Sequence, residues 1–275
     1  MPTAASPIPF SDTPSARRSR AAAPFTARCS ASDVLRWVGL QDHASAETDA
    51  VFFSMRRLRA DTVLAHEGQA FEHLYFVSAG SFKSVQTDLE GYEQVLGFAI
   101  RGDSVGLDGL YQGRYTSTAI ALEDSMVAVM PFRELVAAGH RVSALEHLLL
   151  HAAGAELMHR SDTQYLMSAA SSEVRVARFL LHLAQRQTAM GHSDRRFRLR
   201  MTRRDIASYL GVAHETVSRA LTALSQSGYI AVSHRDIEIT DTVALHELQR
   251  LTRGTWRGSL RERAAQQQPA LQMAA

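Results

Sequence analysis

The clearest pattern of hydrophobic and polar positions lies between Met201 and Gln226. Thr202, followed three residues later by Asp205, is typical of a capped helix start, and Gly211 provides a tight turn. Apolar residues recur at helical spacing on both sides of this glycine: Ile206, Ala207, Leu210, Val217, Leu221 and Leu224. The spacing predicts two short helices joined by a turn, each with one face in a core.

The flanking segments predict the rest of a small domain. A helix over Glu173–Gln187, capped by Ser171 or Ser172, precedes a short strand over Phe197–Met201. Beyond the helix pair, two strands, Tyr229–Ser233 and Asp236–Thr240, flank the turn His234-Arg235, and Asp241 caps a last helix that ends near Arg250. Helix, strand, helix-turn-helix and two-stranded wing make a winged helix.

Between Met55 and Met130 the pattern changes to short strands separated by turns. Turn signals recur every 11–12 residues, which predicts an antiparallel barrel or roll. A short helix precedes this region around Val34 and Leu35, and Pro131 opens a helix over Arg133–Ala138. The predicted strands are Thr62–His66, His73–Ser78, Ser81–Thr87, Glu93–Ile100, Thr116–Ala121 and Ser125–Met130.

A long helix is predicted from Val142 to about Met167. Its apolar residues follow spacings of three and four, which is typical of a parallel dimer seam but also of a face packed against the roll. The seam reading is preferred because a helix-turn-helix that reads a two-fold DNA site requires a dimer. The predicted dimerisation residues are Val142, Leu145, Leu149, Ala152 and Leu166.

These patterns divide the chain into five segments. Residues 1–28 and 254–275 are predicted to be disordered tails, because they hold few large apolar residues. The segments between them are a β-roll domain (29–140), a dimerisation helix (141–168) and a winged-helix DNA-binding domain (169–253).

Charge is distributed unevenly along the chain. The formal net charge is +2, yet Ser168–Arg253 contains 13 arginines against 8 acidic residues. Six arginines gather at the start of the helix pair, where phosphate contacts would position a duplex: Arg195, Arg196, Arg198, Arg200, Arg203 and Arg204. No apolar run has the length of a membrane span and no signal peptide is recognised, so a cytoplasmic location without membrane contact is expected.

Four separated motifs resemble the Crp/Fnr family of bacterial transcription regulators, and within it the Fnr-like subgroup. They are HLYFVSAGSFKSV, the run Gly102–Gly106, SMVAVMPF at Ser125–Phe132 and RFRLRMTRRDIASYLGVAHETVSRAL. The resemblance covers roughly Ser32–Arg253. It implies an α+β fold: an N-terminal antiparallel β-roll of the cupin-like or cyclic-nucleotide-binding type, a long dimerisation helix and a C-terminal winged helix-turn-helix.

The resemblance also implies a DNA sequence. The subgroup's E-T-x-S-R pattern reads inverted repeats similar to TTGAT-N4-ATCAA, so Glu215 would accept from cytosine, Arg219 would donate to guanine, and Ser218 would lie against the outer A·T region. Thr202, Arg203, Arg204, His214 and Thr216 are the expected DNA-backbone contacts. Loops of the roll around Lys83 and the Glu90-Gly91 turn are expected to touch RNA polymerase.

The sensor positions of related proteins are poorly matched here. Oxygen-responsive members hold a four-iron–four-sulfur cluster on four cysteines, whereas this chain has only Cys29, with Leu35 and Ala128 at two other cysteine positions. Leu107 replaces the glutamate that relatives use for cyclic AMP, and Arg114 is not followed by Ser or Thr. No cofactor is therefore expected, and neither cluster nor cyclic AMP binding is predicted.

Several alternatives stay open at this point. Asp108 and Arg114 could serve another anion, and Cys29 could be a redox-active thiol. Haem could be bound through His43, His66 or His73. A ligand-binding module without DNA output and an enzyme with a regulatory roll are disfavoured by the Glu215, Ser218 and Arg219 face and by the lack of catalytic motifs. The sequence predicts a homodimeric transcription regulator that is not an enzyme.

Overall fold

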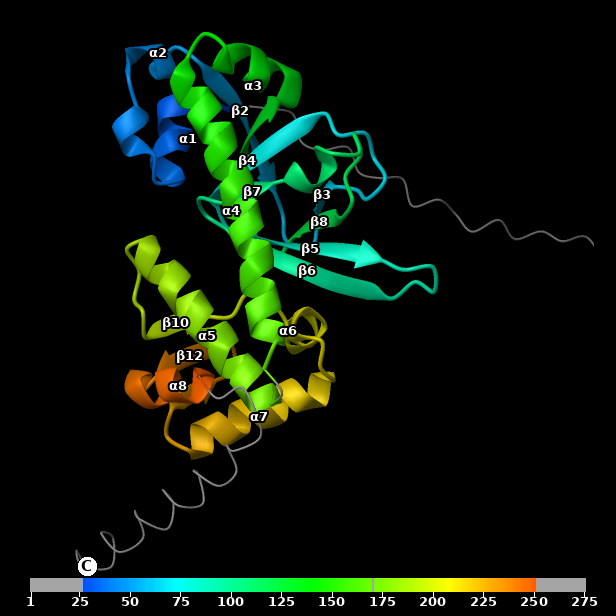
Figure 1. Ribbon diagram of the computed structural model, residues 1–275, viewed down its shortest axis with the longest axis vertical. Helices are drawn as coiled ribbons and strands as arrows, with labels where there is room; N and C mark the ends of the chain where they lie inside the picture. Colours follow the sequence, from blue (N-terminus) through cyan, green and yellow to red (C-terminus); the bar gives the residue numbers. More distant parts are fainter. Residues whose placement is uncertain (1–26, 170, 251–275) are drawn as a thin grey trace, which may run out of the picture.

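The computed structural model describes residues 27–169 and 171–250. Its N-terminal half is the predicted roll, built from two antiparallel sheets with strand orders β1-β2-β9-β4-β7 and β3-β8-β5-β6 (Figure 1). The strands are β1 (Ala27–Ser30), β2 (Phe52–Leu58), β3 (Val63–Ala65), β4 (His73–Ala79), β5 (Ser81–Thr87), β6 (Glu93–Ile100), β7 (Ser104–Val105), β8 (Thr118–Ala121) and β9 (Ser125–Pro131).

Two apolar clusters hold the roll together. One lies between the sheets and includes Tyr75, Val77 and Phe82, while the other fills the space between the five-stranded sheet and the surrounding helices. The helices are α1 (Ala31–Trp37), the 3-10 turn η1 (Gln41–His43), α2 (Ala46–Asp49), α3 (Phe132–Gly139) and the first half of α4 (Ser143–Met167), with a second 3-10 turn, η2 (Leu107–Gly109), after β7.

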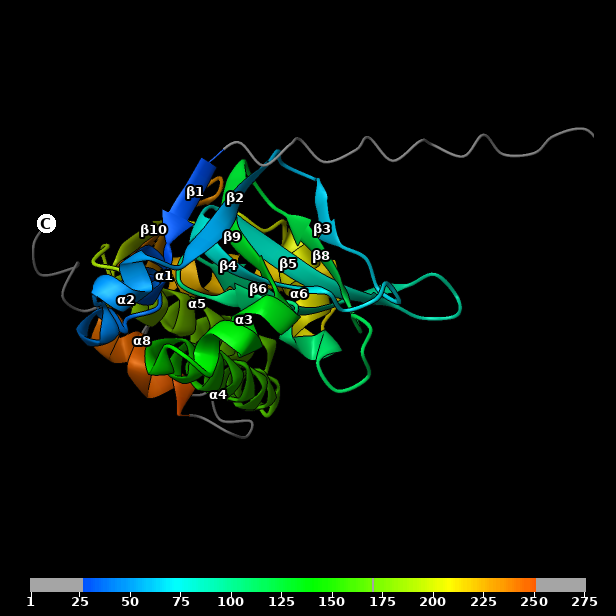
Figure 2. The same cartoon turned by 90° about the horizontal axis from the view of Figure 1, so that it is seen from above.

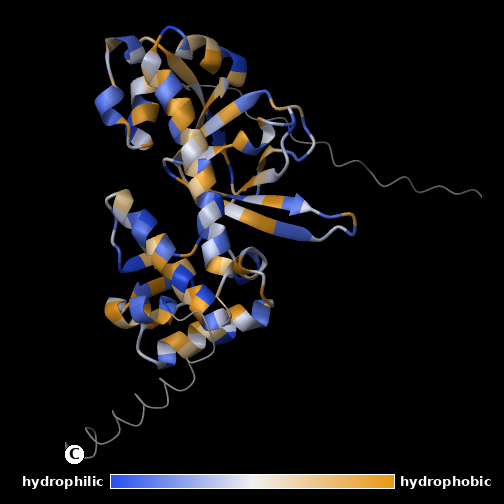
Figure 3. Ribbon diagram, viewed as in Figure 1, coloured by the Kyte–Doolittle hydropathy of each residue, from blue (hydrophilic) through white to orange (hydrophobic). Residues whose placement is uncertain are grey.

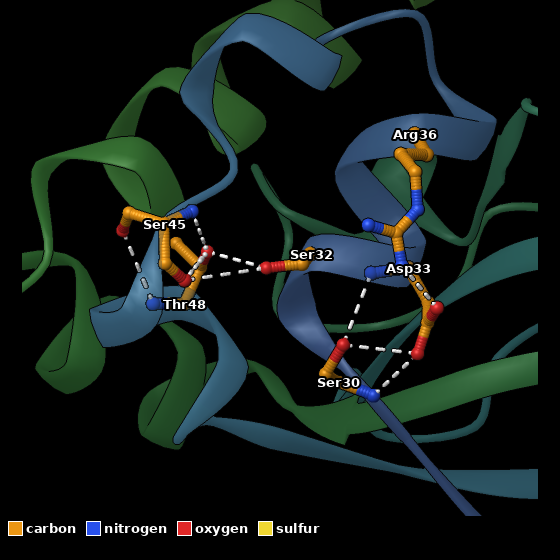
Figure 4. Close-up of polar contacts among 6 residues, drawn as sticks. All are labelled: Ser30, Ser32, Asp33, Arg36, Ser45 and Thr48. Carbon is orange, nitrogen blue, oxygen red and sulfur yellow. Dashed lines mark hydrogen bonds and ion pairs between the residues drawn. The ribbon is translucent and has the colours of Figure 1, made fainter.

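Hydroxyl groups fix the start of the roll. Ser30 caps α1 and Ser45 caps α2, each in a reciprocal capping box with the residue three positions later. Ser32 Oγ lies 2.6 Å from Thr48 Oγ1, and both side chains are buried (Figure 4). The Ser32–Thr48 contact joins α1 to α2.

Helix α4 runs from the roll to the C-terminal domain (Figure 1), and the view from above looks nearly along its axis (Figure 2). Leu145, Ala152 and Leu166 were expected at a dimer seam, but they are 0, 3 and 2% exposed within a single chain. Val142 and Leu149 pack partly against the same cluster of the roll as Leu145 and Ala152. The predicted seam is therefore wrong for the three buried residues, because helical spacing marks a covered face without saying what covers it.

The opposite side of α4 carries a different set of apolar residues. Leu150, Leu157, Met158 and Tyr165 are 65, 67, 61 and 49% exposed. At 100° per residue they lie on the face turned away from Leu145 and Ala152. Hydrophobic and hydrophilic residues alternate along the visible side of this helix (Figure 3).

The C-terminal half is the predicted winged helix. Its three-stranded sheet has the order β10-β12-β11, and one apolar cluster joins the sheet to four helices. The elements are α5 (Ser172–Ala189), β10 (Arg196–Arg198), α6 (Arg203–Leu210), α7 (His214–Gln226), β11 (Ile230–Ser233), β12 (Asp236–Ile239) and α8 (Thr242–Gln249).

The structure differs from the sequence expectations in three strands. Strands β1, β2 and β7 were not predicted, and Ala27 and Arg28, which were assigned to the N-terminal tail, pair with β2. The remaining tail residues, 1–26 and 254–275, lie outside the described residues. Within the described part of the chain, no helix combines the length and the apolar character that crossing a membrane would require.

Candidate nucleic-acid interface

Helix α6 begins as its sequence predicts. Thr202 Oγ1 accepts from the backbone N–H of Asp205 at 3.1 Å, and the Asp205 carboxylate accepts from both the N–H and the hydroxyl of Thr202. The helix ends at Gly211, whose φ of 62° lies in the left-handed region that favours glycine. The turn then leads directly into α7.

Helix α7 separates a buried face from an exposed one. Val217, Ala220, Leu221 and Leu224 pack into the core of the winged helix. The base-reading candidates Glu215, Ser218 and Arg219 are all exposed on the other side. Ala213 occupies the N-cap position and makes no side-chain cap hydrogen bond, as the sequence predicted. A duplex can therefore reach the outward face without any rearrangement of the helix.

The first turn of α7 carries a preorganised charge pattern. Glu215 Oε1 lies 3.0 Å from His214 Nδ1, and Arg219 Nη2 donates to Thr216 Oγ1 at 3.3 Å. The pKa of Glu215 is lowered, first by a hydrogen bond from its own backbone N–H and then by His214. Glu215 is thus ionised at neutral pH and can act as an acceptor only, which suits a cytosine amino group.

The residues expected to contact the DNA backbone lie in different places and differ in burial. Thr202, Arg204 and His214 line a groove of about 810 Å³ between the winged helix and the roll, with Lys83 and Glu93 on its other wall. The described residues offer Arg204 no ion pair. Arg204 is therefore the best-placed cation for a phosphate in this group.

Arg203 is half-buried and contacts the wing. Its Nη2 donates to the carbonyl of His234 in the wing turn at 3.0 Å, while Nη1 is buried without a hydrogen-bond partner among the described residues. Burial, and then the nearby Arg235, lower the pKa of Arg203. In this arrangement, Arg203 supports the wing.

Three of the six arginines in the predicted basic cluster form ion pairs within the chain. Arg196 binds Glu238 at 2.7 Å, and Arg198 lies 3.8 Å from Asp236. Arg200 lies 3.2 Å from Glu123, which belongs to the roll. These exposed pairs are weak in water, so their arginines can exchange an acidic partner for a phosphate at little cost.

Arg235 is a functional candidate that the sequence analysis used only as a turn residue. It is exposed at the tip of the wing, lies in the same groove as Arg204, and donates from Nη1 to the carbonyl of Arg200 at 3.3 Å. Its neighbour His234 has a φ of 55°, which turns the wing sharply. A basic residue at a wing tip next to a helix-turn-helix would have been a usable signal.

The sensor candidates of the roll are bound by their own chain. The Asp108 carboxylate accepts from the backbone N–H and hydroxyl of Thr116 and from Ser117 Oγ, and Arg114 donates to the carbonyl of Gly68. A cavity of about 330 Å³ lies between η2, β6, α4, α5 and α6, and Leu107 and Asp108 belong to its lining.

Cys29 lies beside apolar residues. Leu35 and Ala128, which stand at two cysteine positions of the oxygen-responsive relatives, are both 0% exposed and belong to the cluster against which Cys29 packs. Burial, and secondarily Asp33, raise the pKa of the Cys29 thiol to about 11. The thiol is therefore protonated at neutral pH, in the form that is a poor nucleophile and metal ligand.

The three candidate haem ligands lie in different places. The ring of His43 stacks on that of His147 with centroids 4.8 Å apart, and the ring of His73 lies 6.2 Å from that of Tyr75. His66 follows β3 in an exposed turn. Across residues 27–169 and 171–250, no group of three or more His, Cys, Asp or Glu side chains is arranged to hold a metal ion.

Lys83 corrects one expectation about partners. Its Nζ lies 2.7 Å from Asp205 Oδ1, and its side chain is only 19% exposed. Lys83 is therefore engaged with the winged helix and does not lie in an exposed loop of the roll. The Glu90-Gly91 turn, by contrast, is exposed at the end of the β5–β6 hairpin.

Comparison with known proteins accounts for both halves. Residues 174–248 match the Crp-like helix-turn-helix domain, and residues 55–138 match the cyclic nucleotide-binding domain. The "Fumarate and nitrate reduction regulatory protein" of Escherichia coli K12 is 34% identical over 225 residues, which cover 82% of this chain and 90% of that protein. The "Fumarate nitrate reduction regulatory protein" of Klebsiella oxytoca is 33% identical over 80% of this chain and 88% of its own length.

Solved structures extend the likeness to the fold. FixK2 from Bradyrhizobium japonicum superposes with a TM-score of 0.66 and 28% identity, over 73% of this chain and 99% of that one. A CRP-family regulator from Thermus thermophilus, at 22% identity and a TM-score of 0.56, shares the fold over 70% of this chain and 96% of its own. The chain belongs to the Crp/Fnr family of DNA-binding transcription regulators, whose members are not enzymes.

Proposed function

We propose that the protein is a homodimeric regulator that reads an Fnr-type inverted repeat similar to TTGAT-N4-ATCAA. The observation that carries this proposal is the exposed face of α7, which presents Glu215, Ser218 and Arg219 together while the opposite face is buried. Two copies would place their α7 helices in major grooves about one helical turn apart.

Each exposed residue has one role in this proposal. The Glu215 carboxylate accepts from a cytosine amino group, and Arg219 exchanges its contact with Thr216 for guanine O6 and N7. Ser218 lies against the outer A·T pairs. Thr202, Arg204, His214 and Thr216, with Arg235 added from the structure, contact the backbone, while Arg203 steadies the wing.

Arg219→Ala is the sharpest test of the DNA sequence. It should weaken binding to the TTGAT-N4-ATCAA duplex by about 1–3 kcal/mol per half-site, which is the value of one bidentate base contact. Titration of both proteins with this duplex and with a scrambled one, at fixed salt, measures the change.

Arg204→Ala is the matched control, since it removes an arginine expected to contact only phosphate. It should lower the affinity for both duplexes to the same extent and reduce the dependence of that affinity on salt concentration. An Arg219→Ala protein that still prefers the TTGAT duplex as strongly as the wild type would refute the assigned role.

The dimer seam is proposed to lie on the exposed side of α4. Leu150, Leu157, Met158 and Tyr165 form an apolar strip that points away from the roll of the same chain. Two such strips in parallel would cover each other and relate the two winged helices by a two-fold axis, as an inverted repeat requires.

Leu157→Glu tests this seam. It should convert the dimer to monomer in sedimentation velocity and abolish cooperative operator binding, because two like charges would meet in an apolar interface. Val243→Glu, an equally exposed apolar residue on α8, is the control and should remain dimeric. A dimeric Leu157→Glu protein would place the interface elsewhere.

A four-iron–four-sulfur cluster does not fit the described residues. Leu35 and Ala128 fill their positions with buried methyl groups, and the pKa of Cys29 is raised. We therefore propose that DNA binding in this protein proceeds without such a cluster. Protein purified in air should bind the operator duplex and lack the visible absorption of iron–sulfur centres, and iron in stoichiometric amounts would overturn the proposal.

The cavity of about 330 Å³ favours one alternative, a regulator gated by a small molecule. Its lining includes η2 from the roll, α4, α5 and Tyr209 from α6, so an occupant would touch all parts of the chain that must keep a fixed arrangement. Dialysis of the protein against haem, cyclic nucleotides or cell metabolites, with operator affinity as the readout, separates this alternative from constitutive binding.

Contact with RNA polymerase is proposed for the tip of the β5–β6 hairpin. Leu89 and Tyr92 are 108 and 58% exposed beside the Glu90-Gly91 turn. Leu89→Ala should lower transcription in a purified system while leaving operator affinity unchanged.

A further inference from the structure

The roll and the winged helix meet at a joint on the edge of the four-stranded sheet. Strand β6 is the edge strand of the four-stranded sheet, and helix α6 covers its free edge (Figure 1). The backbone N–H of Val95 donates to Ser208 Oγ at 2.8 Å, and that hydroxyl donates to the carbonyl of Glu93 at 3.2 Å. Gln94 Nε2 also donates to the carbonyl of Ser208. Ser208 of α6 therefore supplies hydrogen-bond partners to the edge strand, as a neighbouring strand would otherwise do.

An ion pair reinforces this contact from the next strand of the roll. Lys83, the only lysine in the chain, lies on β5 and reaches the first turn of α6 at Asp205. Both side chains are sheltered, at 19 and 9% exposure. Burial alone would raise the pKa of Asp205, but hydrogen bonds from Lys83 and then Thr202 outweigh it and hold the pKa below its usual value. The carboxylate that caps α6 thus also anchors it to the roll.

Apolar contacts run through the same joint. Phe98 of β6 lies 5.1 Å from the ring of Tyr209 and 6.2 Å from that of Phe179, in α6 and α5. Val85, Val95 and Phe98 belong to the core cluster of the winged helix although they come from the roll. Arg186 of α5 donates to the carbonyl of Phe98. The joint therefore includes buried apolar packing that is continuous with the core of the winged helix.

The joint leaves the reading face open. It uses α5 and α6, whereas Glu215, Ser218 and Arg219 on α7 stay exposed. The docked arrangement is therefore compatible with DNA contact, and it sets the direction in which α7 points relative to the roll and to α4.

We propose that Lys83 and Ser208 are positioning residues that fix the spacing between half-sites that the dimer accepts. This inference rests on the proposed function, because spacing has meaning only for two helices that read an inverted repeat. One extra base pair between half-sites turns one of them by about 35° relative to the other. A rigid joint penalises that change, and a loosened joint tolerates it.

The test is binding of full-length Lys83→Met, Ser208→Ala and the double variant to duplexes with N3, N4 and N5 spacers at fixed salt. The wild type should prefer N4, and in the variants this preference should fall by about tenfold, the factor that corresponds to a single hydrogen bond to a charged group. The penalty for a base change within TTGAT should stay as in the wild type. Lys83→Arg should restore the spacing preference.

Arg204→Ala is the control for a simple loss of affinity, since it should lower the affinity for the duplexes with all three spacers equally. Circular dichroism and sedimentation check that each variant is folded and has the oligomeric state of the wild type. An unchanged spacing preference in the double variant would overturn the proposal, as would an equal loss of half-site discrimination.

A second measurement is independent of DNA. Because Lys83 carries the only side-chain amine, an amine-acylating reagent followed by mass spectrometry reports on this joint alone, with the α-amino group as internal reference. Acylation of Lys83 should be slow in the wild type and at least severalfold faster in Ser208→Ala.

Fast acylation of Lys83 in the wild type would show that Lys83 is not engaged with α6, and the joint would then not form as described. Failure of the wild type to bind any spacer would instead overturn the proposed function, and the spacing role with it, even where slow acylation shows that the joint forms. The two failures are therefore distinguishable.

Discussion

The two halves of the chain bury polar groups of different kinds. In the roll, the buried polar side chains of the described residues are hydroxyls: Ser32, Thr48, Ser81, Ser117 and Ser125. In the winged-helix half they are charged, namely Arg178 and Asp205. Neutral hydroxyls can be satisfied by one or two local hydrogen bonds, whereas a buried charge requires several well-placed partners.

The buried charges mark the places where separate elements must keep a fixed relative position. Asp205 joins α6 to the roll, and Arg178 joins α5 to the ends of α4 and α8. Both charges therefore sit where separate elements must keep a fixed relation. The roll interior, in contrast, has the neutral character of a packing core, and its thiol, Cys29, is also uncharged at neutral pH.

Arg178→Met should have the largest effect on stability. Arg178 is 2% exposed, and its guanidinium donates to the carbonyls of Tyr165 and Gln249 and to Ser168 Oγ and lies 4.2 Å from the centre of the Tyr165 ring. Methionine would remove all three of these hydrogen bonds: the Gln249 carbonyl would lose the guanidinium donor, whereas the Tyr165 carbonyl would keep its donors from Ser168. We expect a cost of about 3 kcal/mol or more. Urea denaturation followed by circular dichroism measures this loss.

The control for this variant lies in the roll. Arg36→Met removes a half-exposed ion pair with Asp33 at helical spacing and should cost less than about 1 kcal/mol. Equal losses in the two variants would mean that the buried charge of the winged-helix half contributes nothing special.

A second consequence concerns pH. Burial, and then Arg186, lower the pKa of His182 to about 4, so the folded protein keeps this ring neutral while the unfolded chain takes up a proton near pH 6.5. Its neighbours are Asp162, Asp103 and His159. The unfolded state therefore gains protons first as the pH falls, and stability should drop by about 3 kcal/mol between pH 6.5 and pH 4.

His182→Gln should remove most of this drop and leave stability at pH 8 nearly unchanged. Thermal unfolding between pH 8 and pH 4.5 measures the slope, with the exposed His140→Gln as control. An acid slope that His182→Gln leaves intact would assign the effect to the carboxylates.

The sequence predicted the winged helix well because its signals are local. Thr202 and Asp205 cap a helix within one turn, Gly211 allows the left-handed turn, and the wing is bounded by its own turn residues. The exposed face of α7, which carries the proposed base-reading residues, followed from the same periodicity, since Val217 and Leu221 identify the buried side of the helix. Motif and fold agree wherever neighbouring residues decide the structure.

The failures have a common physical cause. Strand β2 was missed because its sequence, FFSMRRL, does not alternate, and its burial depends on β1 and β9 on either side. Leu145 and Ala152 were assigned to a dimer seam but pack against the roll, because helical periodicity does not identify the surface that covers an apolar face. Lys83 and Asp205 are 122 residues apart in the chain, so no local sequence pattern predicts their ion pair.

The smallest expected effect is that of Cys29→Ser. The thiol is partly buried, and its pKa of about 11 keeps it protonated, so serine replaces one neutral side chain by another of similar size. Operator affinity of protein purified in air should change less than twofold, a difference within about 0.4 kcal/mol. Titration of the TTGAT-N4-ATCAA duplex with and without a thiol reductant checks this expectation. Loss of binding on substitution, or a reversible loss on oxidation that serine prevents, would make Cys29 a functional group and break the contrast between a neutral roll and a charged winged-helix half.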